Sequence, residues 1–135
     1  MKAHLTRRYI FSASHRLHTD RLTPEKNRAV YGKCNNPHGH GHNYALEVTV
    51  SGQVDAATGM VCNLVDLDAA VRQEVIDRFD HVNLNLVPDF SSQVPTTENL
   101  SAAIFQILKQ SFHQAHLEKI RLEETGKNSF EYDGS

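Results

Sequence analysis

Two stretches of the chain place an apolar side chain at every second position. They are residues 5–15 and residues 43–54. The apolar positions are Leu5, Tyr9, Phe11 and Ala13 in the first stretch, and Tyr44, Leu46, Val48 and Val50 in the second. Neighbouring side chains of a strand point to opposite faces, so this period predicts two β-strands with one buried face each. Residues 16–37 between them are polar and predict a long loop with room for a short helical turn. A loop of this length is uncommon in a small domain unless it carries function.

Two later stretches change to the helical period. Residues 64–79 have apolar side chains at three- and four-residue spacing, and Asn63 followed by Asp66 resembles a capping pair. A second helix is predicted to begin at Pro95-Thr96-Thr97-Glu98, where a hydroxyl N-cap precedes a carboxylate in the first turn. The predicted buried positions are Leu64, Leu67, Val71, Val75 and Phe79 in the first helix, and Leu100, Ile104, Ile107 or Leu108, and Phe112 in the second.

Two short strands are predicted to close the chain. They span about 116–124 and 129–132 and are joined by the turn Gly126-Lys127-Asn128. The order of elements is then strand, strand, helix, helix, strand, strand. Strands on both sides of a helix pair favour an α+β fold, with a four-stranded antiparallel sheet and two helices on one of its faces. Since no repeat or linker divides the sequence, we expect residues 1–135 to form a single domain.

The composition narrows the class of protein. The chain has 135 residues, of which 39% are hydrophobic and 22% charged, with a net charge of −2. It lacks the clustered basic residues typical of nucleic-acid binding, and no apolar run reaches the roughly 18–20 residues that cross a bilayer. The first residues have no apolar segment of the secretory type, and the two cysteines, Cys34 and Cys62, do not make a disulfide framework. We therefore expect a cytoplasmic protein with neither a nucleic-acid nor a membrane partner.

Nine histidines in this chain are an unusual number, and three of them fall within residues 38–42. His15 has the same phase as the apolar residues of the first strand, and His40 and His42 have the phase of the second. If these strands pair antiparallel, the end of the first lies beside the start of the second. Three histidines with an open fourth position are the ligands of a catalytic zinc, so we predict zinc at His15, His40 and His42. The alternative is that these are surface histidines, which is our expectation for His38.

Three further residues have chemistry suited to proton transfer. Cys34 lies in the polar loop, and a thiol near a zinc ion and a cation has a lowered pKa that suits a base or a nucleophile. Asp80 and His81 follow the first predicted helix, and an imidazole oriented by a carboxylate is a common proton-transfer arrangement. The simpler alternatives are an idle free thiol at Cys34 and a favourable helix-dipole contact at the Asp80-His81 pair.

The carboxylate of Glu124 is predicted to face the apolar side of its strand. Ile120, Leu122 and Glu124 share one phase of residues 116–124. A buried carboxylate needs a cation or N–H donors, and the paired N–H groups of a pterin or purine ring match its two oxygens. The alternatives are an ion pair with Arg7 or Arg121, or a position at the fraying end of the strand.

Seven stretches of the sequence resemble the 6-pyruvoyl-tetrahydropterin synthase family. They are Phe11-Ser12-Ala13-Ser14-His15, Gly32-Lys33-Cys34-Asn35-Asn36, Gly39-His40-Gly41-His42-Asn43-Tyr44, Gly59-Met60-Val61, Asp80-His81-Val82-Asn83-Leu84-Asn85, Pro95-Thr96-Thr97-Glu98-Asn99 and Glu124-Thr125. They occur in family order and extend over nearly the whole chain. No single stretch is specific, but seven in register are.

The resemblance implies a fold, an assembly and a metal. The fold is the tunnelling fold, in which the four-stranded sheets of three subunits join into a barrel. Two such trimers stack into a homohexamer. The metal is Zn²⁺, held by His15, His40 and His42.

The resemblance also implies roles for the other site residues. Cys34 would abstract a proton from the substrate side chain, and Asp80 and His81 of a neighbouring subunit would complete the proton relay. Glu124 would anchor the pterin ring. The further substrate-binding residues implied in the same pocket are Thr96, Thr97 and Glu98.

The activity implied is that of a zinc-dependent lyase that converts 7,8-dihydroneopterin triphosphate to 6-pyruvoyl-tetrahydropterin with elimination of triphosphate, without a redox cofactor. Five residues lie between Cys34 and His40, as in family members of tetrahydrobiopterin pathways. The 6-carboxy-tetrahydropterin synthases of queuosine biosynthesis typically have three, and their reaction is the first alternative. A second, from another class, is a non-catalytic zinc- or pterin-binding module; the intact set of Cys34, Asp80, His81 and Glu124 argues against it.

Overall fold

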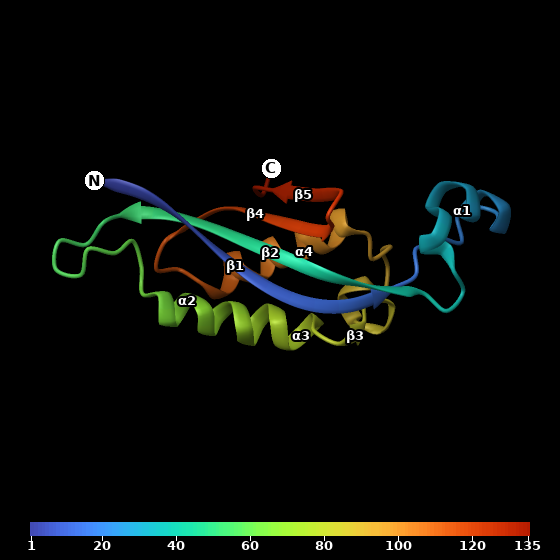
Figure 1. The fold of residues 1–135 in the computed structure, drawn as a ribbon, viewed down its shortest axis with the longest axis horizontal. Helices are drawn as coiled ribbons and strands as arrows, with labels where there is room; N and C mark the ends of the chain where they lie inside the picture. The colour runs from blue at the N-terminus through green and yellow to red at the C-terminus, as the bar shows by residue number, and fades with distance from the viewer.

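The computed structural model describes residues 1–135, and a ribbon of two long strands runs through its centre (Figure 1). Strand β1 spans Lys2–His15 and strand β2 spans His40–Gln53. The two pair antiparallel along their whole length, so that His15 lies opposite His40. The predicted pairing of these strands is confirmed. Because β2 begins three residues earlier than predicted, both His40 and His42 belong to the strand itself.

Five strands form the sheet, in the order β3-β1-β2-β4-β5. Strand β4 (His116–Thr125) pairs antiparallel with β2, and β5 (Asn128–Tyr132) pairs antiparallel with β4. Strand β3 consists of Val82–Asn83 and pairs parallel with β1. The prediction of a four-stranded, wholly antiparallel sheet is therefore wrong. Two residues are too few to show an alternation of apolar and polar positions, so the sequence pattern carried no sign of β3.

Two helical segments cover one face of the sheet. The first is α2 (Leu64–Val71), which continues through a π-helical turn (Arg72–Ile76) into α3 (Asp77–Phe79), and it covers the range predicted as one helix. The second is α4 (Thr97–Ser111). In Figure 1, α2 and α3 form one nearly continuous rod along the β1–β2 ribbon. None of the helices combines the length and apolar character that a membrane span requires.

Side chains cap both covering helices where the sequence predicted caps. The side chain of Asn63 accepts from the backbone N–H groups of the first turn of α2. The hydroxyl of Thr96 accepts from the N–H of Asn99 at the start of α4. These N–H groups have no partner inside the helix, so each cap stabilises its helix by about 1 kcal/mol.

The core lies between these helices and the sheet, and its members are the residues of apolar phase. Burying an aliphatic or aromatic side chain of this size stabilises the fold by about 1.5–3 kcal/mol. Leu108, rather than Ile107, completes the buried face of α4. The largest fully buried apolar side chains are Phe11, Tyr44, Leu46, Leu67, Phe79, Leu84, Leu100, Ile104, Leu108, Ile120 and Leu122.

The polar segment 16–37 contains more structure than the predicted loop. It forms α1 (Pro24–Tyr31), capped by Thr23, and then a 3₁₀ turn over Gly32–Asn35. Helix α1 has only eight residues and few apolar ones, so it left no clear helical period in the sequence. Figure 1 places α1 beyond the end of the sheet, beside the point where β1 ends and β2 begins. The segment thus returns Cys34 to the strand ends that carry the histidines.

Candidate metal centre

Three imidazoles and one thiol meet where β1 ends and β2 begins. His15 is the last residue of β1, and His40 and His42 project from the same face of β2. The centroids of the three rings lie 5.3, 5.0 and 4.7 Å apart. The candidate ligand atoms of these histidines and of Cys34 all lie within 4.8 Å of one another. We call these four residues the His/Cys cluster.

His15 is bonded as a metal ligand would be. Its side chain is buried, with 1% exposed, and its Nδ1 lies 2.9 Å from the backbone oxygen of Pro95. A carbonyl oxygen only accepts, so Nδ1 carries the proton and Nε2 holds the lone pair. That Nε2 is buried and has no hydrogen-bond partner, which is costly unless a cation takes it up. A histidine that binds a metal commonly donates its other N–H to a carbonyl in this way.

The other two histidines are already close to the spacing of a shared metal. The Nε2 atoms of His40 and His42 are 3.1 Å apart. Two nitrogens bound to one tetrahedral zinc, each at about 2.0–2.1 Å, lie about 3.3–3.4 Å from each other. Burial lowers the pKa of His15 and of His42, which favours the neutral imidazole that a metal requires.

Cys34 is half-buried in the 3₁₀ turn that follows α1. Its backbone carbonyl accepts a hydrogen bond of 2.7 Å from the N–H of Leu17, which ties the turn to the chain just after His15. Burial raises the pKa of the Cys34 thiol, and the negative charge of Glu124 raises it further. The protein groups therefore oppose the predicted lowering of this pKa, and a bound cation would have to supply it.

Glu124 lies on the same side of the sheet as the cluster, as its phase predicted. Its side chain is 13% exposed, and one carboxylate oxygen is 3.9 Å from Nε2 of His42. The hydroxyl of Thr97 donates to that carboxylate, and the side-chain amide of Asn128 donates to its other oxygen at 3.3 Å. These donors hold the side chain in place, so it presents a nearly buried carboxyl group beside the three imidazoles.

The ion pairs considered as alternatives for Glu124 do not form. The guanidinium of Arg7 pairs with Asp68 at 2.9 Å, and that of Arg121 pairs with Glu47 at 2.7 Å. No basic side chain of the chain forms a salt bridge with Glu124 other than the nearby His42. Its inward direction therefore comes from hydrogen-bond donors and leaves the carboxylate free of a permanent cation.

The three residues that the resemblance implied for substrate binding are not equivalent. Thr97 is buried, with 2% exposed, and contacts Glu124. The hydroxyl of Thr96 is engaged in capping α4, and Glu98 is exposed. The fold thus brings Thr97 into the site, whereas Thr96 and Glu98 lie beside it.

Asp80 and His81 do contact each other. Nδ1 of His81 lies 3.0 Å from one oxygen of Asp80, and the other oxygen accepts from the backbone N–H of Ser12 at 2.9 Å. That N–H holds the pKa of Asp80 below its usual value, and the His81 side chain adds to the effect. The pair therefore has the geometry of an imidazole oriented by an ionised carboxylate.

This pair is not part of the His/Cys cluster of its own chain. His81 lines a shallow cavity of about 370 Å³ together with Ser12, Ser14 and Asn43. These strand residues have the opposite phase to the three clustered histidines, so they project to the other face. The His81 side chain is 81% exposed and points to solvent rather than to the cluster.

Comparison with known proteins identifies the family of this chain. The chain matches the family model described as 6-pyruvoyl tetrahydropterin synthase over residues 4–135. It belongs to the 6-pyruvoyl tetrahydropterin synthase family. It is 48% identical to 6-pyruvoyl tetrahydrobiopterin synthase of Poecilia reticulata over 132 residues, which are 97% of this chain and 90% of that protein.

A solved structure extends the likeness to the fold. The Caenorhabditis elegans 6-pyruvoyl tetrahydropterin synthase superposes with a TM-score of 0.93 at 40% identity, covering 100% of this chain and 97% of that one. A putative 6-carboxy-5,6,7,8-tetrahydropterin synthase of Archaeoglobus fulgidus is 41% identical over only 71 residues, or 53% of this chain and 56% of that protein. The likeness to proteins named for the pyruvoyl product therefore extends over much more of the chain.

Two residues that contact site side chains in this protein were not predicted from the sequence. The carbonyl of Pro95 fixes the tautomer of His15, and the amide of Asn128 holds Glu124. A backbone carbonyl has no signal in a sequence. Asn128 was assigned only to a turn, and its contact with Glu124 follows from the irregular pairing of β4 with β5 near Glu123.

Proposed function

We propose that this chain converts 7,8-dihydroneopterin triphosphate to 6-pyruvoyl-tetrahydropterin with elimination of triphosphate. The observation that carries the proposal is the His/Cys cluster with a carboxylate, Glu124, held inward beside it. The similarity over nearly the full chain to proteins named 6-pyruvoyl tetrahydrobiopterin synthase supports the same reaction. The reaction requires proton transfers and the loss of triphosphate, and it needs no external oxidant or reductant.

We propose Zn²⁺ as the resident metal, held by His15, His40 and His42. The donor set fits, because the Nε2 of His15 is buried without a partner and those of His40 and His42 are 3.1 Å apart. Three imidazoles leave a fourth position open, which distinguishes catalytic from structural zinc. When bound, zinc supplies a Lewis acid that acidifies groups of the substrate side chain.

Each protein group then has a separate task. Cys34 is proposed to take a proton from the substrate side chain, which lies between the thiol and the imidazoles. The carboxylate of Glu124 binds the paired N–H groups of the pterin ring, as bidentate recognition of a carboxylate requires. Thr97 holds that carboxylate in place through its hydroxyl.

The proton relay is proposed to be completed by Asp80 and His81 of a neighbouring subunit. The support is that His81 is not part of the cluster of its own chain and is largely exposed. A homohexamer built as two stacked trimers, with the sheets joined into a barrel, would also cover the open edges at β3 and β5. Sedimentation should find a hexamer, and a stable monomer at micromolar concentration would contradict a site shared between subunits.

A product assay on the purified, zinc-loaded protein tests the function. We expect 6-pyruvoyl-tetrahydropterin together with inorganic triphosphate. The main alternative, formation of 6-carboxy-tetrahydropterin, would release acetaldehyde as well. Formation of neither product, with zinc and pterin still bound, would instead indicate a binding module.

A further inference from the structure

Residues 16–19 follow His15 directly, but they pair with no strand. Asparagine side chains hold their backbone instead. Asn85 accepts from the N–H of Arg16 at 2.7 Å and donates to its carbonyl at 2.9 Å. Asn27 accepts from the N–H of Thr19 and donates to its carbonyl, both at 2.9 Å. An amide side chain offers one acceptor and two donors, so it can replace the edge of a neighbouring strand.

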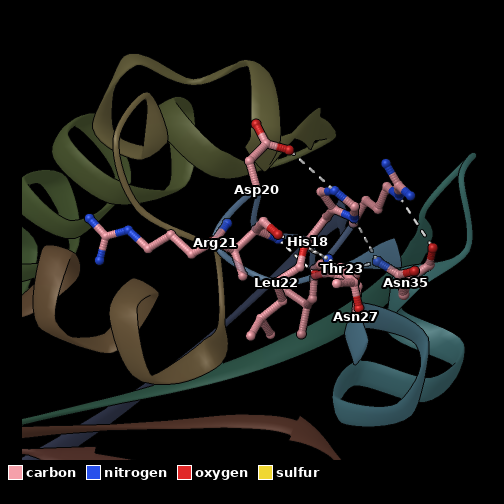
Figure 2. A network of polar contacts seen from close by, with 10 residues as sticks. His18, Asp20, Arg21, Leu22, Thr23, Asn27 and Asn35 are labelled. Carbon is pink, nitrogen blue, oxygen red and sulfur yellow. Dashed lines mark hydrogen bonds and ion pairs between the residues drawn. The ribbon is translucent and has the colours of Figure 1, made fainter. Parts of the chain in front are cut away.

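A third asparagine, Asn35, holds the middle of this segment. Its Nδ2 donates to the carbonyl of Leu17 at 2.8 Å and lies 3.1 Å from Nδ1 of His18 (Figure 2). The Leu17 carbonyl only accepts, which fixes the orientation of the amide and makes the His18 Nδ1 the acceptor. We call Asn27, Asn35 and Asn85 the asparagine clamp. Asn35 and Asn27 are buried, with 5% and 0% exposed.

Asn35 is the member that joins the clamp to the cluster. It is covalently next to Cys34, whose carbonyl accepts from the N–H of Leu17 at 2.7 Å. The Nε of Arg16 donates to the Asn35 carbonyl at 3.2 Å. The turn with Cys34 and the segment after His15 are therefore joined by four hydrogen bonds, two of which come from the Asn35 side chain.

Asn27 secures the far end of the same segment. Besides its two bonds to Thr19, its Nδ2 lies 3.2 Å from the carbonyl of Leu22 and 3.0 Å from that of Thr23. Figure 2 shows Asn27 and Asn35 close together, beside the chain that loops from His18 to Thr23. The segment after His15 is thus held by hydrogen bonds before α1 begins. The turn that contains Cys34 is tied to this segment, and so to the chain beside the cluster.

We propose that Asn35 is a positioning residue that holds the Cys34 thiol against the three imidazoles. The place of the half-buried Cys34 thiol depends on the turn that carries it. A shift of about 1 Å in a reacting group costs roughly 100-fold in rate. The inference rests on the proposed function only in so far as Cys34 acts as a base. The placement of the thiol itself is testable without any turnover.

The first test compares Asn35→Asp with Asn36→Ala. The first change keeps the shape of the side chain but turns its donor group into an oxygen that faces the Leu17 carbonyl. We expect kcat to fall by roughly 10- to 100-fold, while KM and zinc content stay as in the unchanged protein. Asn36 is the matched control, because it is adjacent and exposed, and its replacement should leave kcat unchanged. If Asn35→Asp does not fold, Asn35→Ala removes the same donors without burying a carboxylate.

The second test measures alkylation of Cys34 by iodoacetamide in metal-free protein. Loss of the clamp should speed this reaction, because the thiol gains exposure once the turn that carries it is no longer held. Cys62 is 8% exposed and serves as an internal reference that should stay slow in every variant. The Asn36→Ala protein should react like the unchanged one.

The outcomes separate this proposal from the proposed function. Faster alkylation of Cys34 with a lower kcat supports the positioning role. Unchanged alkylation overturns it, and so does faster alkylation with an unchanged kcat, since Asn35 would then be only structural. Loss of zinc in Asn35→Asp would also overturn it, because the clamp would then be acting on the ligands. If the unchanged protein forms no product, the proposed reaction fails while the alkylation result still decides the placement of the thiol.

Discussion

Histidines lie at both ends of the sheet formed by β1, β2 and β4. The two groups of histidines differ in burial and in the groups that surround them. At the far end from the cluster, Nε2 of His4 and Nε2 of His116 lie 3.7 and 4.0 Å from the same oxygen of Glu118. Ser51 donates to that oxygen at 2.5 Å. The side chains of His4 and His116 are 58% and 74% exposed. Each is therefore open to solvent and lies near a carboxylate.

The difference follows from the phase of the strands and from what covers them. His15 shares the phase of the apolar positions and is 1% exposed, so its unpartnered nitrogen has no access to water. His4 has the opposite phase and projects to the open face of the sheet. Contacts at an exposed carboxylate such as Glu118 add little to stability, whereas a buried nitrogen without a partner is costly. A count of histidines therefore does not identify a metal site, whereas a buried imidazole nitrogen without a partner points to one.

The largest expected effect is on the His/Cys cluster itself. His40→Ala should lose bound zinc and activity together, because two imidazoles no longer outcompete water for the ion. The fold should survive, since the core lies elsewhere, and circular dichroism with elemental analysis will check both points. His116→Ala is the matched control and should keep metal and activity. Full zinc occupancy in His40→Ala would contradict the assignment of His40 as a zinc ligand.

The next effect concerns Cys34, the thiol of the cluster. Cys34→Ala should lower kcat by roughly 100-fold or more, the usual scale for a positioned base, and leave substrate binding nearly unchanged. Single-turnover kinetics and elemental analysis should be combined, because zinc is expected to remain. A variant that loses zinc would instead make the thiol a fourth ligand.

One glutamate lies beside the histidines at each end of the sheet, and replacing the two should have different effects on pterin binding. Glu124→Gln is expected to weaken pterin binding by about 1.5–3 kcal/mol, the range for hydrogen bonds to a charged group. Equilibrium binding of a pterin, followed by fluorescence, measures the change. Glu118→Gln, at the far end, should bind pterin as the unchanged protein does. Normal binding by Glu124→Gln would show that its inward direction is structural.

The smallest expected effect is on stability as a function of pH, and it involves Glu118 at the end of the sheet far from the cluster. The hydroxyl of Ser51 is the main cause that lowers the pKa of Glu118 below its ordinary value of 4.5. Because the folded pKa is lowered, the stabilisation is present above 4.5 and is lost as the pH falls through the lower folded value. Ser51→Ala should therefore lower the urea midpoint slightly near neutral pH, and the difference should shrink in acid. A difference that grows in acid would contradict this assignment.

Much of the fold could be predicted because its main signals are local. The alternation of apolar residues located β1 and β2, and the caps at Asn63 and Thr96 located the starts of two helices. Strand β3 was not predicted, and helix α1 was anticipated only as a short helical turn somewhere in residues 16–37. β3 has two residues and depends on its pairing with β1, and α1 is stabilised by its cap and by Asn27 rather than by an apolar face.

Along a regular strand, the sequence alone indicates which face each residue occupies, because side chains alternate between the two faces except at β-bulges such as those in β4. This was enough to group His15 with His40 and His42 and to turn Glu124 inward. The groups that complete the site could be identified only from the tertiary structure. The carbonyl of Pro95 contacts His15, and Thr97 contacts Glu124. Asparagine side chains hold the segment that positions Cys34. The tertiary structure also separated His81 from the cluster of its own chain. Such contacts join residues far apart in the chain, and packing of the helices and the loop against the sheet sets their distances.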